Sequence, residues 1–121
     1  MTVQEALTLA RRLTPSQYSD DDLRRWLMLC ERHIFDSIIL THEDSRCCPT
    51  PDGEDCYELI APDLFAEDIY INFLQARIAK ENAENVKYNQ SISLYNDAYT
   101  RFAKWYNERH RPRPRRVWWR F

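Results

Sequence analysis

Apolar residues near the start of the chain recur at helical spacing and predict a short amphipathic helix. Thr2 and Glu5 form the S/T-x-x-E capping box that opens a helix. The apolar residues that follow line one face: Val3, Ala6, Leu7 and Ala10. We expect this helix to end before Pro15, because proline disfavours helical geometry in the residue that precedes it.

A second, longer helix is predicted from the acidic run at residues 19–22. Ser19 can cap the helix, and the three aspartates lie at the positive end of the helix dipole. Apolar residues then recur three and four apart in one stripe: Leu23, Trp26, Leu27, Cys30, Ile34 and Ile38. Charged residues are assigned to the opposite face: Arg24, Arg25, Glu31 and Arg32.

Residues 42–61 are predicted as an irregular loop, within which residues 57–60 can form a short extended piece. Pro62 suits the first turn of the next helix, where its missing N–H costs nothing. The helical stripe that follows contains Leu64, Phe65, Ile69, Phe73, Ala76 and Ala83, with Tyr70, Leu74 and Ile78 beside it. Because this helix is apolar over more than half its circumference, we expect it to be buried on two sides or to face a partner.

The last predicted helix carries a heptad stripe made almost wholly of aromatic residues. Asparagines at positions 82, 85 and 89 mark its start, and we expect it to reach about His110, since Pro112 and Pro114 prevent continuation. The stripe comprises Tyr88, Ile92, Tyr95, Tyr99, Phe102 and Tyr106, with Leu94, Ala98 and Trp105 on an adjoining strip.

These elements predict an all-α fold: a small four-helix, bundle-like domain at residues 1–110, followed by an extended basic and aromatic arm at residues 111–121. The single glycine of the 121 residues, Gly53, agrees with helices joined by polar loops. It also excludes glycine-rich phosphate-binding loops and the strained turn that presents a hydrolase serine. No apolar run approaches the ~20 residues that a membrane-spanning helix needs, so no membrane partner is expected.

The net charge of −2 conceals an asymmetry between the body and the arm. From Arg109 onward there are six arginines and no acidic residue. Removing these six from the 17 basic residues leaves 11 against 19 acidic ones, so residues 1–108 carry −8 and the remainder +6. Blocks of like charge at a terminus are typical of interaction arms. The first residues have the wrong charge order for a secretory signal, which predicts an intracellular protein or one carried inside an intracellular assembly.

Candidate catalytic and metal chemistry is weak in this sequence. His42, Cys47, Cys48 and Cys56 offer four possible zinc ligands, but adjacent cysteines chelate poorly, and we favour free thiols. The acids around Gly53 do not fit a calcium loop, since Cys48 falls at its first position. No local signature pairs a nucleophile with a histidine. We therefore expect no enzyme activity, no metal and no cofactor.

Candidate interaction residues lie on the aromatic helix and in the arm. Tyrosine and tryptophan are enriched at protein–protein contacts, because a large ring meets the partner while its polar tip meets water. An exposed cluster such as Val117–Phe121 would risk aggregation unless docked on nucleic acid or in an acidic protein groove. The predicted interface residues are Tyr95, Tyr99, Trp105, Tyr106, Arg113, Arg115, Arg116, Trp118, Trp119 and Phe121.

The arrangement resembles the head–tail connector (adaptor, or head-completion) proteins of tailed phages, particularly those of gut Firmicutes prophages. The resemblance rests on the first helix TVQEALTLARRL, the acidic start SDDDLRRWL and the final helices DIYINFLQARIAKENAEN and SLYNDAYTRFAKWYNERH, with its ending FAKWYN. It covers most of residues 2–110. The central cysteine-containing loop and the Arg/Trp-rich arm have no placed counterpart in the family.

The resemblance implies a structural virion protein without cofactor or reaction, located in the neck and assembled in the host cytoplasm. Such proteins form a ring, usually of twelve copies, below the portal, extend the DNA channel and receive the next neck or tail-completion protein. The alternative is a small nucleic-acid-binding or regulatory protein that uses the Arg-rich tail, although the acidic body disfavours it.

Overall fold

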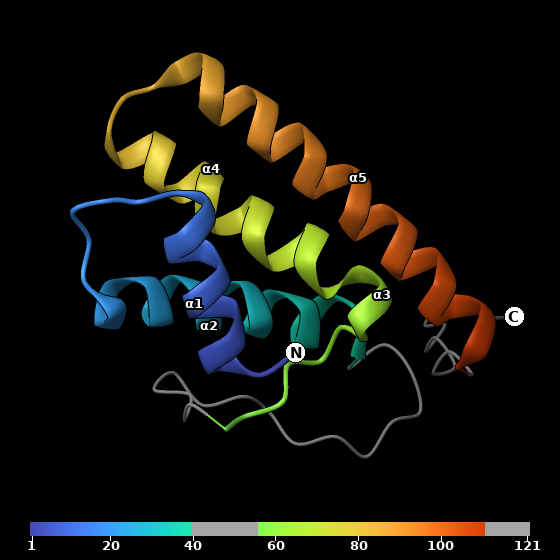
Figure 1. Cartoon of the computed structure of the whole chain (residues 1–121). Helices are drawn as coiled ribbons and strands as arrows, with labels where there is room; N and C mark the ends of the chain where they lie inside the picture. The colour runs from blue at the N-terminus through green and yellow to red at the C-terminus, as the bar shows by residue number, and fades with distance from the viewer. Residues whose placement is uncertain (40–55, 111–121) are drawn as a thin grey trace, which may run out of the picture.

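The computed structural model describes residues 1–39 and 56–110, and these form an all-α, bundle-like domain (Figure 1). Helix α1 (Val3–Leu13) leads to α2 (Asp20–Ser37). The chain then forms one continuous helical rod from α3 (Asp63–Ala66) through a π-helical turn, η2 (Glu67–Ile71), to α4 (Asn72–Glu81). Helix α5 (Asn85–Arg109) returns beside α4. The predicted fold class is confirmed.

Both N-terminal helices begin as the sequence predicts. The Thr2 hydroxyl accepts a hydrogen bond from the backbone N–H of Glu5, and the Ser19 hydroxyl accepts one from Asp22. The predicted apolar residues of both helices are buried, including Cys30 at 1% exposure. The expected extended piece pairs with the start of α1: Val3 N–H donates to the carbonyl of Tyr57, and Leu59 N–H donates to that of Met1.

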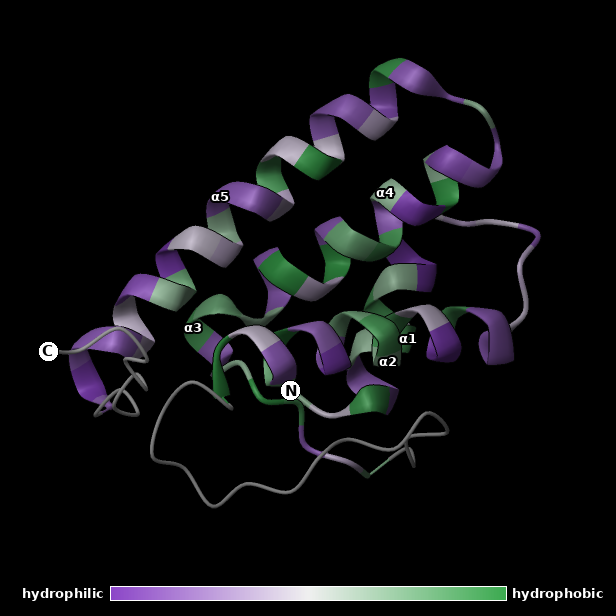
Figure 2. Ribbon diagram, turned by 180° about the vertical axis from the view of Figure 1, so that it is seen from behind, coloured by the Kyte–Doolittle hydropathy of each residue, from purple (hydrophilic) through white to green (hydrophobic). Residues whose placement is uncertain are grey.

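The rod of α3, η2 and α4 lies between α5 on one side and α1 with α2 on the other (Figure 1). Its consecutive residues Ile69, Tyr70 and Ile71 are all buried, which requires neighbours on two sides of the rod. Figure 2 shows hydrophobic residues where the rod, α1 and α2 meet, whereas hydrophilic residues recur along α5. The expected burial of this segment on two sides is confirmed.

The structure corrects four sequence-based assignments. Glu31 is fully buried rather than facing solvent with the arginines of α2. Leu64 is 73% exposed, whereas the next two residues of α3, Phe65 and Ala66, are buried. Pro62 caps α3 in extended geometry (ψ 162°) instead of occupying its first turn. Ala83 lies beyond α4 with a φ of 57° and is exposed, so it does not extend the buried stripe.

The left-handed conformation of Ala83 closes the end of α4. Glu84 N–H donates to the carbonyl of Ala79 at 2.9 Å, and Ala83 N–H donates to that of Lys80 at 3.2 Å. This pair of bonds is the Schellman arrangement, which satisfies the last carbonyls of a helix. Glycine ordinarily occupies the left-handed position, because any other residue brings its Cβ against the following carbonyl.

Candidate interaction surface

The aromatic stripe of α5 divides into buried and half-buried rings. Tyr95 and Tyr106 are 8% and 4% exposed and belong to the core of the chain itself. Tyr99 and Trp105 are half-buried and present part of their rings at the surface. Tyr95 and Tyr106 are thus enclosed by this chain's own helices, contrary to their prediction as interface residues, and for Tyr99 and Trp105 the partner contact stays a prediction.

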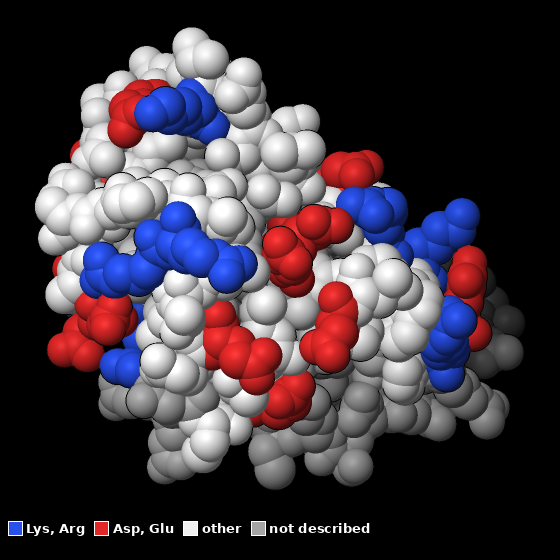
Figure 3. Space-filling view, viewed as in Figure 1, with Lys and Arg blue, Asp and Glu red and all other residues white. Residues whose placement is uncertain are grey.

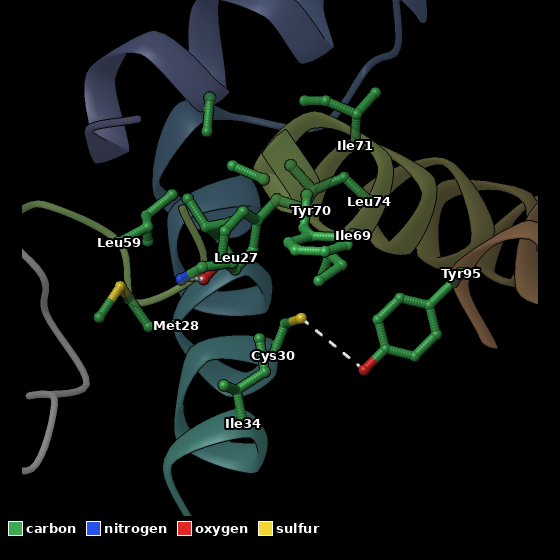
Figure 4. Close-up of a cluster of buried hydrophobic side chains, with 14 of the residues drawn as sticks. Leu27, Met28, Cys30, Ile34, Leu59, Ile69, Tyr70, Ile71, Leu74 and Tyr95 are labelled. Carbon is green, nitrogen blue, oxygen red and sulfur yellow. Dashed lines mark hydrogen bonds between the residues drawn. The ribbon is translucent and has the colours of Figure 1, made fainter. Parts of the chain in front are cut away.

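Tyr95 joins α5 to α2 and α4. Its ring lies 5.4 Å from that of Phe73, and its hydroxyl lies 3.9 Å from the Cys30 sulfur, to which it points (Figure 4). Burial raises the pKa of the Tyr95 hydroxyl and of the Cys30 thiol, so both groups stay neutral inside the fold. These contacts give Tyr95 a structural role.

Tyr99 covers a side chain of α2. Its ring stacks on that of His33 with centroids 5.4 Å apart, and His33 itself is exposed. The His33 ring also lies 3.4 Å from the Ser37 hydroxyl, through Nδ1. This pair connects α5 to the end of α2 at the surface of the domain.

Trp105 stands at the edge of an aromatic cluster near the end of α5. Its ring centroid lies 5.6 Å from that of Phe65 and 6.1 Å from that of Phe102. The guanidinium of Arg109 lies over the indole at 4.5 Å, a cation–π contact. The Trp105 ring thus contacts three side chains of this chain, and part of it remains accessible.

A recess of about 210 Å³ opens beside Trp105. Three rings of α5 form one wall together with the last described residue: Phe102, Trp105, Tyr106 and His110. Ile39, Ile60 and Pro62, which lie outside α5 in the sequence, complete the lining and form its second wall. The His110 ring stacks on Tyr106 at 3.7 Å, nearly parallel, which extends the aromatic wall beyond the end of the helix. Most residues that line the recess are apolar or aromatic, although polar atoms also contribute to its surface.

A buried polar network holds the Ile60–Pro62 wall in place. The Glu31 carboxylate accepts hydrogen bonds from the Tyr70 hydroxyl (Oε1, 2.7 Å) and from the backbone N–H of Ile60 (Oε2, 2.9 Å). The Tyr70 hydroxyl in turn accepts one from the N–H of Ala61 at 3.0 Å. Burial and the neighbouring carboxylate raise the pKa of Tyr70 well above its ordinary value, so the hydroxyl remains a donor.

Acidic residues are frequent in the segment that carries this wall. Between Tyr57 and Tyr70 the sequence has four acids and no basic residue: Glu58, Asp63, Glu67 and Asp68. The side chains of Glu58 and Asp63 are 66% and 91% exposed, and both accept hydrogen bonds from the Met1 ammonium. Asp68 lies 3.7 Å from Arg101. Figure 3 shows red side chains gathered on the face that carries the N-terminus and α3.

The remaining predicted interface residues lie outside the part of the chain that the structure describes: Arg113, Arg115, Arg116, Trp118, Trp119 and Phe121. The same holds for His42, Cys47 and Cys48 of the possible zinc set, whereas Cys56 is described and exposed. Residues 1–39 and 56–110 contain no cluster of three or more histidine, cysteine or acidic groups suited to a metal. Among those residues no helix has the length and apolar character to cross a membrane.

Sequence reasoning found Trp105 but not the recess or its acidic border. The recess forms where Ile39, Ile60 and Pro62 lie beside α5. A periodic pattern within one helix cannot predict which distant residues lie beside it. The absence of basic residues between Tyr57 and Tyr70 was the available signal for the acidic border.

Comparisons of the chain with protein families, curated proteins and solved structures found no match.

Proposed function

We propose that this protein is a structural subunit of a head–tail connector ring of a tailed phage. In this role, copies of the chain assemble below the portal, extend the DNA channel and receive the next neck protein. The accessible edge of Trp105, beside an apolar recess, carries the proposal. A partly exposed tryptophan next to an open apolar recess is typical of a protein–protein contact, since such anchors dominate interface energies.

The helical architecture supports an assembly role for this surface. The Trp105 ring packs against Phe65 of α3 and Phe102 of α5. Because these contacts already restrict its side chain, binding a partner costs little further conformational entropy. Arg109 lies over the same ring and adds a cation at the rim. Aromatic residues and arginine are the types enriched where proteins meet.

The negative charge of residues 1–108 also supports a role in a DNA channel. Residues 1–108 carry −8, and like charge keeps DNA phosphates from adhering to a surface along which DNA must slide. A nucleic-acid-binding domain would instead concentrate basic residues on one face. The proposal assigns the chain no reaction and no cofactor.

Quantitative mass spectrometry of purified virions from the phage or induced prophage that encodes the chain tests this function. We expect the chain in the particle at a copy number near that of the portal protein. Absence from purified virions overturns the proposal. If the absent chain also binds duplex DNA with an affinity that falls steeply with salt, the nucleic-acid alternative replaces it.

A further inference from the structure

We propose that the recess beside Trp105 receives a tryptophan from residues 111–121 of a neighbouring copy, so that adjacent subunits are joined arm to recess. This inference rests on the proposed ring function and names the contact that builds the ring. A head-to-tail contact of this kind uses two different patches per copy, and it closes into a ring when the rotation between copies permits.

The recess has the size and lining for an aromatic side chain. Its volume of about 210 Å³ lies below the range of about 300–1,000 Å³ that small-molecule sites occupy. Its lining combines the rings of Trp105 and Tyr106 with the aliphatic groups of Ile60 and Pro62. An inserted indole can make edge-to-face contacts with the first pair while burying apolar area against the second.

The charges around the recess complement the arm. Residues 111–121 contain five arginines and no acid, and the two tryptophans, Trp118 and Trp119, lie between Arg116 and Arg120. The recess wall is flanked by Glu58 and Asp63, whose carboxylates are largely exposed to solvent. Arginine pairs bidentately with carboxylates, so an arm that inserts a tryptophan brings arginines to this border. The Met1 ammonium lies 2.8 Å from one carboxylate oxygen of Glu58 and 2.8 Å from one of Asp63.

The proposed ring favours a neighbouring copy as the source of the tryptophan. His110 lines the recess, and seven residues separate it from Trp118. The proposed ring requires two different patches on each copy, and an arm that docks in the recess of the next copy supplies them.

Self-association of the full chain, measured by sedimentation equilibrium up to about 1 mM, tests the proposal. The double variant Trp118→Ala/Trp119→Ala removes the inserted rings, and Ile60→Trp fills the recess. We expect the unmodified chain to associate and each variant to raise the dissociation constant at least about 30-fold, as truncation of an interface hot spot does. Leu94→Trp, a similar enlargement at a site on α5 that is 57% exposed, leaves association unchanged.

Mixing the two variants identifies the contact as one between copies. The Ile60→Trp copy keeps an intact arm, and the Trp118→Ala/Trp119→Ala copy keeps an intact recess, so their mixture forms dimers of one copy each and nothing larger. Circular dichroism verifies the fold of each variant, and Trp105→Ala serves as the recess variant if Ile60→Trp is unfolded. Glu58→Gln with Asp63→Asn lowers the salt dependence of association, because fewer charges meet the arm.

A chain that stays monomeric throughout, association that neither variant weakens, or a mixture without dimers each overturns the arm-to-recess contact. These outcomes are distinct from failure of the connector function. If the chain is present in virions but the variants do not weaken its self-association, only the arm-to-recess contact is overturned. If the chain associates through the recess but is absent from virions, the connector function is overturned.

Discussion

Tyr70 and Trp105 are both aromatic residues on helices of one domain, yet their surroundings differ in kind. Tyr70 is fully buried, and its hydroxyl is hydrogen-bonded to Glu31 and to the backbone of Ala61. Trp105 is half-buried beside an open recess of about 210 Å³. Tyr70 is enclosed and hydrogen-bonded within the domain, whereas Trp105 keeps part of its ring accessible beside the recess. We therefore assign a role in stability to the first region and propose a role in interaction for the second.

The largest expected effect is on stability, and it compares a leucine-to-alanine substitution in the core with the same substitution at the surface. Leu74 is fully buried and Leu94 is 57% exposed. Leu74→Ala should lower the free energy of unfolding by about 2–5 kcal/mol, because it removes buried methyl groups and leaves a cavity. Leu94→Ala should change it by no more than about 0.5 kcal/mol. Urea denaturation measures both, and equal losses would contradict the placement of the core.

Tyr70→Phe tests the polar network that holds the recess wall. We expect a loss of about 1–3 kcal/mol in the free energy of unfolding, since the substitution removes one bond to the Glu31 carboxylate and leaves Ala61 N–H without its acceptor. Tyr88→Phe, at a half-buried tyrosine of α5, is the matched control and should be close to neutral. Chemical denaturation of both variants decides, and no difference between them would show that the network adds nothing.

Ala83→Gly should stabilise the protein. Glycine adopts the left-handed conformation of this position without strain, so we expect a gain of about 1 kcal/mol, reduced by the greater freedom of glycine in the unfolded chain. Ala103→Gly, inside α5, should instead cost about 1 kcal/mol. Thermal denaturation should shift in opposite directions for the two variants, and a shift in the same direction would contradict the Schellman ending of α4.

The smallest effect at neutral pH concerns the buried pair Cys30 and Tyr95, and it grows only in alkali. Burial raises both pKa values, so the folded state keeps protons that the unfolded chain releases near its ordinary values of about 8.5 and 10. Stability is therefore complete below those values and falls as the pH rises through them. Tyr95→Phe should reduce the slope of unfolding free energy against pH above about 10; an unchanged slope would contradict burial of the hydroxyl.

Local patterns were sufficient to predict most of the helices. The caps at Thr2 and Ser19 act within three residues, and the end of α5 at Arg109 follows from the prolines beyond it. Glu31 shows where such reasoning fails. Its position looks polar and solvent-facing in the helical pattern, but its partners, Tyr70 and Ile60, come from segments 39 and 29 residues away.

The recess escaped prediction for the same physical reason, since its two walls come from distant segments. The burial of Tyr95 and Tyr106 shows the related limit of the heptad pattern. A heptad of rings predicts which residues share a face of α5, but the number of helices packed on that face decides which rings remain accessible. Trp105 lies at the border of the core because α5 packs against residues 57–66 there.

The amount of Trp105→Ala chain in purified virions, relative to the portal protein, tests the central claim most directly. Quantitative mass spectrometry should find at least about 10-fold fewer copies than in wild-type particles, because the substitution removes the interface anchor. Circular dichroism should show the same helical content as wild type, since the ring is only half-buried. A folded Trp105→Ala chain that enters virions at the wild-type level would contradict the assignment of this surface to assembly.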